Sequence, residues 1–364
     1  MTEHVRVGIV GTSRWADTMH LPGLQSHPRA EIAAICGRNR ERAEEMARKY
    51  SIPQVFTDYH ELIDKGDVQA LVVSTPDDVH YPVTMTALDA GLHVLCEKPM
   101  ALNVQQAREM TEKAESAGVK HMVYFTWRWV PYVRYLRQLI EEGYLGRCFH
   151  GHFHWMAGYG RGGNYRWRWD RQRALGILGD LGSHMIDLAH CCIGDIARVS
   201  ANLSTFVERP GPDGQPLDRA NDSAMLILQF ANGAQGVIHI SAVAHLGNRS
   251  AKKQIVLHGD AGTLEVEFCL GENYTIQGTR HDEKQTETLS IPAQILEGLD
   301  PDSPFSTWSD RLFTEQAVGG RLFIDTILEN RSVPPTFHDG LKVQQVIDAA
   351  IEADQRGCWI SLKD

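Results

Sequence analysis

Short apolar runs alternate with helix-forming stretches over the first 125 residues. The run VRVGIV at 5–10 is apolar at most positions rather than at every second one, and the later runs have the same character. Strands that are apolar on both faces are typical of a parallel sheet covered by helices on both sides. We therefore predict an α/β fold here, a doubly wound parallel sheet of the Rossmann type over residues 1–125. The expected strands lie at 5–10, 31–36, 70–74, 93–96 and 121–125, and the expected helices at 15–26, 41–50, 79–90 and 104–117.

The pattern changes after residue 125. Polar and apolar residues now alternate, as in GVIHISAV at 236–243, and this period of two indicates strands with one face covered. The second domain, residues 126–364, is therefore predicted to be α+β with a large, mostly antiparallel sheet. PGPDGQP at 210–216 is expected to be a hairpin loop, and the polar stretch 271–310 gives no clear pattern. The expected strands lie at 145–157, 199–207, 224–230, 234–241, 253–258, 262–268 and 359–362, and the expected helices at 321–329 and 340–354.

Composition agrees with two globular domains and narrows the choice of partners. The chain has 364 residues, more than one hydrophobic core usually holds. Its formal net charge of -10 argues against binding to a nucleic-acid backbone. No apolar run approaches the roughly 20 residues of a membrane helix, and the first expected strand begins too early to leave room for a signal peptide. The seven cysteines are scattered without a CxxC pair, so we expect a reduced, cytoplasmic protein.

The turn after the first expected strand has the spacing of a phosphate-binding turn. Aligned with G-x-G-x-x-G/A, its three key positions are Gly11, Ser13 and Ala16. A helix that begins here would offer backbone N–H groups and a partial positive charge to a pyrophosphate. We expect these residues, with Arg14 and Trp15 between them, to bind a dinucleotide. Because the middle glycine is absent, an ordinary strand-to-helix turn is the alternative.

The end of the second expected strand bears on the choice of dinucleotide. An acidic residue at this point usually holds the ribose hydroxyl of NAD, but here the sequence is Cys36-Gly37-Arg38-Asn39-Arg40, without an acid. Arg38 could pair with the 2′-phosphate of NADP. We therefore expect NADP or NAD as the cofactor, with NADP favoured. The alternative is that Arg38 and Arg40 are solvated residues at the start of a helix.

The strand expected at 93–96 runs directly into Glu97-Lys98-Pro99. Ligands of a doubly wound sheet lie outside the carboxyl ends of its strands, and Lys98 would stand at such an end. A partly desolvated lysine releases its proton more readily and can donate it to a developing alkoxide. Lys98 is therefore a candidate catalytic residue, the alternative being a solvated lysine in a turn.

A second candidate cluster lies in the segment 176–190. On a helix, Asp180, His184 and Asp187 would share one face. Histidine transfers protons near neutral pH, so this face favours acid–base chemistry. The same residues could ligate a metal with the help of Cys191, but no partner from another segment is apparent and we expect no metal. A buried structural histidine held by an aspartate is the other alternative.

Tryptophans and arginines interleave at 126–132 and 165–170. Flat apolar rings beside hydrogen-bond donors suit a sugar, which has CH faces and a rim of hydroxyls, although core packing or an oligomer interface would use the same residues. His150, His152 and His154 alternate along one expected strand, and we assign their shared face to an interface or cleft edge rather than to a metal. The candidate substrate residues are Trp127, Arg128, Tyr165, Trp167, Arg168, Asp180 and His184.

Taken together, these motifs resemble the Gfo/Idh/MocA oxidoreductases, the family of glucose-fructose oxidoreductase and inositol dehydrogenase. The most specific parts of the resemblance are Glu97-Lys98-Pro99 and Asp180-x-Gly182-x-His184-x-x-Asp187. Ser13 in place of glycine, Thr126 in place of asparagine and Ala174-Leu175 in place of two glycines depart from the usual pattern. The other matching motifs, in order along the chain, are Gly11 to Ala16, Ser74-Thr75-Pro76 with His80, Phe125-x-x-Arg128-x-x-Pro131, Trp167-Arg168 and the closing segment 334–353.

The resemblance implies roles for individual residues. Lys98 and His184 would be catalytic, and Asp180 would complete the group and contact the substrate. It also implies a homodimer or homotetramer built on the antiparallel sheet, and often a cis bond before Pro99. The residues expected to bind the cofactor are Gly11, Ser13, Arg14, Trp15, Ala16, Arg38, Ser74, Thr75, Pro76, His80, Glu97 and Lys98.

The expected activity is transfer of a hydride between NAD(P) and a hydroxyl-bearing carbon of a sugar, sugar derivative or polyol. His184 would take the hydroxyl proton, Asp180 would orient the imidazole or a hydroxyl, and Lys98 would stabilise the alkoxide-like charge. Two other functions stay open: a glycosidase that oxidises its substrate transiently, and a non-catalytic regulator that binds a dinucleotide. The sequence does not identify the sugar, the physiological direction or the oligomer size.

Overall fold

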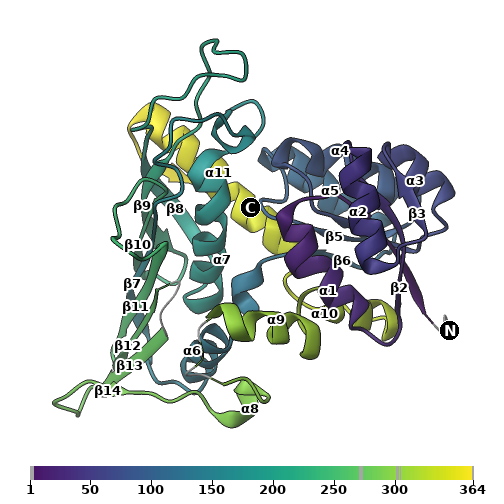
Figure 1. Ribbon diagram of the computed structural model, residues 1–364. Helices are drawn as coiled ribbons and strands as arrows, with labels where there is room; N and C mark the ends of the chain where they lie inside the picture. Colours follow the sequence, from purple (N-terminus) through teal and green to yellow (C-terminus); the bar gives the residue numbers. More distant parts are fainter. Residues whose placement is uncertain (1–3, 270–273, 301–302, 304, 363–364) are drawn as a thin grey trace. The chain divides into compact units, whose positions relative to one another are not determined.

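The computed structural model describes residues 4–269, 274–300, 303 and 305–362, and the chain divides into two units (Figure 1). The first unit comprises residues 1–126 and 309–342, and the second comprises 127–308 and 343–364. Each unit is built on a sheet of its own.

The sheet of the first unit has six parallel strands in the order β3-β2-β1-β4-β5-β6. The order of the strands reverses between β1 and β4, and in open sheets of this kind ligands bind at such a reversal, outside the carboxyl ends of the strands. The prediction of a doubly wound, Rossmann-type parallel sheet is confirmed. The strands are β1 (Val5–Val10), β2 (Ala30–Cys36), β3 (Gln54–Phe56), β4 (Ala70–Val73), β5 (His93–Cys96) and β6 (His121–Val123).

Local start signals explain why most helices of this unit match the predicted stretches. Asn39, for example, accepts a hydrogen bond from the backbone N–H of Arg42 at the start of its helix, and Asn103 caps a later helix in the same way. β3 and α3 have no counterpart among the predicted elements, because β3 is only three residues long and half-buried at the sheet edge. The helices are η1 (Ala16–His20) running into α1 (Leu21–Gln25), α2 (Arg40–Tyr50), α3 (Tyr59–Lys65), α4 (Asp77–Asp89) and α5 (Val104–Ser116).

The segment 309–342 returns to the first unit. It holds most of α9 (Phe305–Glu315), all of α10 (Gly319–Leu328) and the start of α11 (Phe337–Arg356). α10 packs on α1, β1 and β5 and buries Phe323 and Ile324. The sequence analysis expected one boundary near residue 125 and assigned all later residues to the second domain. An amphipathic pattern shows that a helix has a buried face, but it does not show which sheet covers that face.

The sheet of the second unit has nine strands in the order β14-β13-β12-β11-β7-β10-β9-β8-β15. Every neighbouring pair is antiparallel except β10 and β7, which are parallel, so the predicted large, mostly antiparallel sheet is confirmed. The strands are β7 (Cys148–Ala157), β8 (Ile196–Ser204), β9 (Ser223–Phe230), β10 (Gln235–Ser241), β11 (Ala251–Gly259), β12 (Gly262–Cys269), β13 (Tyr274–Arg280), β14 (Glu287–Thr288) and β15 (Ile360–Ser361).

The two faces of this sheet differ, as the period-two pattern predicts. Phe153, Ile238 and Ile255 point to a buried face, against which α6 (Pro131–Glu141) and α7 (Ser183–Cys192) pack (Figure 1). Residues at the alternate positions form the other, exposed face. The remaining short elements of the unit are η3 (Trp167–Trp169), η4 (Leu178–Gly182) and α8 (Ala293–Leu296), while η2 (Thr126–Trp129) lies at its start.

Candidate functional site

The turn after β1 requires glycine at its first position. Gly11 has a φ of +124°, and a Cβ atom on it would stand 2.0 Å from the carbonyl oxygen of Ser74. Backbone from the ends of β1 and β4 therefore meets here more closely than any other residue type would allow. This is the position in the sheet where the strand order reverses.

Ser13, which stands where the middle glycine of the motif is usual, caps the helix. Its Oγ accepts a hydrogen bond from the N–H of Ala16 at 3.1 Å and lies 3.2 Å from the Oγ of Ser74. Serine lacks the backbone freedom of the usual glycine. Its side chain instead caps the helix and connects the start of the helix to the end of β4. Arg14 and Trp15 are exposed beside it.

Arg38 follows β2 directly and is exposed. In the part of the chain that the structure describes, Arg38 forms no ion pair, whereas Arg40 contacts Glu44 at 3.4 Å. Gly37 allows this strand end to approach Thr12 closely, because a Cβ on Gly37 would lie 2.4 Å from the Thr12 methyl group.

The loop after β4 is held from behind by His80. The Nε2 of His80 lies 3.0 Å from the carbonyl oxygen of Thr75, and its Nδ1 lies 2.8 Å from that of Pro99. Burial lowers the pKa of His80, so the ring is neutral and donates to one of the two carbonyls at a time. The structure thus places Ser74, Thr75 and Pro76 in the loop itself and His80 beneath it, as a link to the turn after β5.

Glu97 is buried and paired, while Lys98 is half-buried. The Oε1 of Glu97 lies 2.8 Å from the Nε2 of His20, and its Oε2 accepts a hydrogen bond from the backbone N–H of Lys98 at 3.2 Å. The peptide bond between Lys98 and Pro99 is cis, as the resemblance implied. Glu97 therefore fixes the backbone from which the lysine side chain extends.

His20 and Tyr124 were not among the residues predicted for the site. The His20 ring lies 4.2 Å from the Tyr124 ring, centroid to centroid, and is fully buried. A lone histidine in a helical stretch carries no pattern that points to Glu97, which is 77 positions further along the chain. Only the parallel packing of the strand ends brings the two together.

In the second unit, Asp180 lies at the centre of a polar cluster. It belongs to the π-helical turn η4 and accepts a hydrogen bond of 2.5 Å from the hydroxyl of Tyr159. The Nε of Arg168 lies 3.0 Å from the same Oδ2. Burial and the neighbouring carboxylate raise the pKa of Tyr159 well above its ordinary value, so the tyrosine donates throughout the neutral range. Tyr159 was not among the expected site residues.

Asp187 has a different environment from Asp180. Both of its carboxylate oxygens accept hydrogen bonds from the Nε of Arg128, at 3.0 Å and 2.8 Å, and the pair is buried. The expected face shared by Asp180, His184 and Asp187 therefore holds two separate ion pairs. Arg128, which was expected to contact the substrate, joins η2 to α7 through this pair.

His184 is buried beside two indoles. Its ring centroid lies 6.4 Å from that of Trp127, edge to face, and 5.8 Å from that of Trp155. Trp127 and Trp155 are themselves 5.3 Å apart and perpendicular. The structure thus brings the predicted substrate residue Trp127 together with the predicted catalytic residue His184.

The remaining predicted substrate residues lie in the segment 165–168, of which Arg168 contacts Asp180. Arg168 stacks over Trp167 at 4.5 Å, and the hydroxyl of Tyr165 donates to Asp170 at 3.3 Å. Tyr165, Trp167 and Arg168 are all half-exposed. They therefore form the accessible part of the cluster, while His184 forms its buried part.

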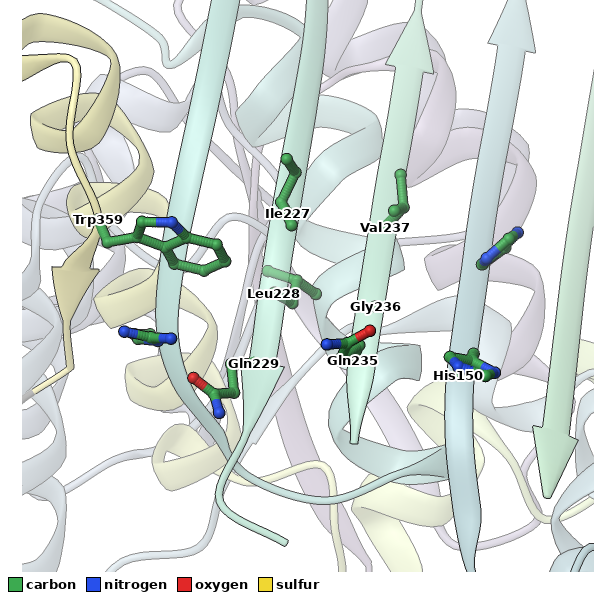
Figure 2. A pocket seen from close by; sticks show the side chains of 10 residues that line it. His150, Ile227, Leu228, Gln229, Gln235, Gly236, Val237 and Trp359 are labelled. Carbon is green, nitrogen blue, oxygen red and sulfur yellow. The ribbon is translucent and has the colours of Figure 1, made fainter. Parts of the chain in front are cut away.

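The exposed face of the sheet has a hollow of its own (Figure 2). It is lined by Trp359, by Ile227 of β9 and by Val237 of β10. His150 and His152 of β7 also line it. His154 lies further along the same strand face. None of the residues predicted to bind substrate or cofactor lines this hollow.

Among the described residues, no group of three or more His, Cys, Asp or Glu residues could hold a metal ion. Within the same residues, no helix is both long enough and apolar enough to cross a bilayer.

Two known protein families match this chain, one within each of the two units. Residues 5–125 match the family described as "Oxidoreductase family, NAD-binding Rossmann fold", and residues 133–265 match the "GFO/IDH/MocA C-terminal domain". An uncharacterized oxidoreductase of Synechocystis sp. is 30% identical over 371 residues, covering 99% of this chain and 97% of the relative.

Proteins with named substrates are also similar. Levoglucosan dehydrogenase of Pseudarthrobacter phenanthrenivorans is 28% identical over 364 residues, covering 90% of this chain and 88% of the relative. A solved structure of levoglucosan dehydrogenase in complex with NADH and levoglucosan has a TM-score of 0.88 at 27% identity, covering 99% of this chain and 100% of that one. The chain belongs to the Gfo/Idh/MocA oxidoreductase family and has its NAD-binding Rossmann fold.

Proposed function

We propose that this oxidoreductase transfers a hydride between NAD(P) and a hydroxyl-bearing carbon of a sugar, sugar derivative or polyol. The observation that carries the proposal is the His184 imidazole, which is buried beside two indoles. Four residues before it in the chain, the carboxylate of Asp180 is bound by Tyr159 and Arg168. A relative that acts on levoglucosan, an anhydrosugar by its name, supports the substrate class.

The residues at the strand-order reversal fit a dinucleotide. Gly11 leaves no Cβ in the turn, and the helix capped by Ser13 begins at the same point. We assign cofactor contacts to this turn (Gly11 to Ala16), to Ser74-Thr75-Pro76, to Glu97 and to Lys98, with His80 holding the loops from beneath. When bound, NAD(P) would supply the nicotinamide carbon that accepts or returns the hydride.

His184 is assigned the proton transfer. A neutral imidazole accepts the proton of the substrate hydroxyl during oxidation and returns it during reduction. Asp180, held by Tyr159 and Arg168, keeps a negative charge near that exchange and accepts a hydrogen bond from a second hydroxyl. The indole walls exclude water and offer flat surfaces to the CH faces of a sugar.

Lys98 is assigned electrostatic stabilisation. Its backbone N–H is held by Glu97, so the side chain extends from an ordered turn. An ammonium directed at the reacting oxygen stabilises the alkoxide-like charge of the transition state. Variants of Lys98 and of His184 therefore test the two assigned roles.

The choice of cofactor rests on Arg38. No acidic residue follows β2, and an exposed arginine at this position favours a 2′-phosphate and therefore NADP. The NADH found in the levoglucosan dehydrogenase structure belongs to a relative whose own residues decide its preference.

The exposed sheet face supports assembly into a homodimer or homotetramer. Ile227 and Met225 of β9 are 53% and 48% exposed, and Trp359 is 42% exposed beside them. Large apolar side chains gathered on an open sheet are typical of a protein interface. All seven cysteines are free thiols, which supports a reducing compartment such as the cytoplasm.

The experiment is a screen of monosaccharides, inositols and anhydrosugars with NAD and NADP, followed by absorbance of the reduced cofactor. In the active pair, Lys98→Met should lower kcat about a hundredfold or more, while fluorescence titration should show a far smaller change in cofactor binding. The control is Lys113→Met, which alters an exposed helix residue of the same unit. Near-normal turnover of Lys98→Met would remove Lys98 from the mechanism.

Two other outcomes would replace the proposal. Release of a sugar from a glycoside without net reduction of the cofactor would identify a glycosidase. Tight cofactor binding with no turnover across the whole panel would favour a non-catalytic regulator.

A further inference from the structure

Lys253 is a buried amine that the proposed mechanism does not use. It lies on β11 with its side chain on the covered face of the second sheet, and only 3% of the residue is exposed. Among the described residues, no hydrogen-bond partner lies within reach of its Nζ. A lysine in such a place is unusual, because burying an ammonium group without a partner destabilises the folded protein.

Aromatic rings take the place of polar partners. The cross-strand neighbours of Lys253 are Trp155 on β7 and Phe268 on β12. Its Nζ lies 4.0 Å from the centroid of Trp155, 5.4 Å from that of Phe268 and 2.7 Å from that of Trp127. The electron-rich faces of indole rings attract a cation, and this attraction is strongest where water is excluded.

The same two indoles form the walls around His184. Trp127 lies 6.4 Å from the imidazole and Trp155 lies 5.8 Å from it, centroid to centroid. Lys253 and His184 thus contact the same pair of rings. Two ion pairs lie on the elements beside these rings: Arg128 of η2 pairs with Asp187 of α7, and Asp180 of η4 pairs with Arg168.

We infer that Lys253 is a positioning residue: its amine holds the indoles of Trp127 and Trp155 against the imidazole of His184 and thereby sets the proton affinity of that imidazole. The inference rests on the proposed role of His184 as the proton-transfer residue. Burial also lowers the pKa of the Lys253 amine well below its ordinary value, so the amine is kept at a cost in stability.

The sign of the effect on His184 does not depend on the charge of the amine. If Lys253 is protonated, its positive charge disfavours a second positive charge on His184. If it is neutral, its N–H groups still bind the faces of the indoles that exclude water from the imidazole, a contact that methionine does not make. Both effects lower the pKa of a histidine, so removal of the amine should raise the pKa of His184.

The test compares Lys253→Met, Lys253→Arg and the control Lys252→Met. Lys252 is the preceding residue, points to the opposite face of the sheet and pairs with Glu267 at 2.8 Å. The first readout is an NMR titration of the His184 ring in histidine-labelled protein, assigned with His184→Asn. This measurement requires no substrate, so it stands even if the screen finds no dehydrogenase activity.

Lys253→Met should raise the pKa of His184 by about half a unit or more, and change the tryptophan emission of the protein. The acid limb of kcat/KM should move to higher pH by the same amount, with kcat falling more than KM changes. Because methionine fills the site without a polar group, the melting temperature should be unchanged or higher. Lys253→Arg should stay closer to the wild type, and Lys252→Met should match it.

An unshifted His184 titration in Lys253→Met would overturn the inference, and so would equal shifts in Lys253→Arg and Lys253→Met. A lower melting temperature with a normal titration would show that Lys253 only packs the sheet. If the shift occurs but no substrate turns over, the inference stands and the proposed function fails.

Discussion

Arg128 and Asp187 form a buried ion pair in which the guanidinium Nε lies 3.0 Å and 2.8 Å from the two carboxylate oxygens. This pair determines the role of Asp187 within the segment from Asp180 to Asp187. Its last aspartate anchors α7 to η2 through Arg128. Since η2 carries Trp127, the ion pair also fixes one wall around His184.

The first prediction concerns this pair. Arg128→Met should destabilise the protein by about 3–5 kcal/mol, because it leaves the carboxylate of Asp187 buried without its partner. Arg128→Met combined with Asp187→Leu should recover most of that loss, since neither charge then remains. Urea unfolding measures both values. A single variant of normal stability with a raised substrate KM would instead return Arg128 to the substrate-binding residues.

The second prediction concerns Tyr159. Tyr159→Phe removes the hydroxyl that donates to Asp180 but keeps the ring that stacks on Trp169 at 6.0 Å. We expect stability to fall by no more than about 1 kcal/mol and kcat/KM to fall about tenfold, because Asp180 loses one of the two groups that orient it. Steady-state kinetics and thermal unfolding separate the two effects. The matched control is Tyr81→Phe, which removes a hydroxyl that donates to Glu109 and lies outside the predicted site.

The third prediction tests the cofactor preference. Arg38→Ala should raise the KM for NADP about tenfold or more and leave the KM for NAD nearly unchanged, because only NADP carries the 2′-phosphate. Arg40→Ala is the control, since Arg40 contacts Glu44 on its own helix. Equal effects of Arg38→Ala on both cofactors would contradict a role in phosphate recognition.

The fourth prediction concerns stability in acid. Burial, with the nearby His338 as a smaller cause, lowers the pKa of His121 to about 4. Its neutral Nδ1 accepts a hydrogen bond from the N–H of Phe337 at 3.1 Å. Between pH 6.5 and about 4 the unfolded chain binds a proton at this histidine that the folded protein does not. Stability is therefore present above pH 6.5 and is lost as the pH falls through this window.

The contribution of His121 is at most about 3 kcal/mol, from its shift in pKa. In His121→Asn the amide oxygen can accept the same hydrogen bond without titrating, so the free energy of unfolding should fall less steeply with acid. Urea unfolding from neutral pH down to about pH 4 measures the slope. His60→Asn, at an exposed position, is the control and should keep the wild-type slope. Equal slopes in His121→Asn and the wild type would assign the acid sensitivity to other groups.

Most of the fold could be predicted from the sequence because burial leaves a periodic trace. Strands covered on both sides, such as β1 and β4, are apolar at nearly every position, and strands covered on one side, such as β10, alternate. Helices with an asparagine cap began close to where their start signals stand. β3 was not predicted, because three half-buried residues are too few to show a periodic pattern of apolar positions.

Candidate residues were easier to identify than their partners. The sequence by itself pointed to Gly11, Lys98, Asp180 and His184, because each stands in a motif whose spacing is local. It could not show that Glu97 meets His20, that Asp180 meets Tyr159 or that Arg128 meets Asp187. These contacts join residues that are 77, 21 and 59 positions apart, and only the packing of strands and helices closes such distances.

Lys253 shows the difference most clearly. In the sequence it is one of two adjacent lysines at the start of a strand, and both would be read as solvated. The period of two along β11 sends Lys252 to the exposed face and Lys253 to the covered one, where three aromatic rings from other segments enclose it. The sequence determined that neighbouring side chains would point apart; the tertiary structure decided what each would contact, because those contacts come from residues distant along the chain.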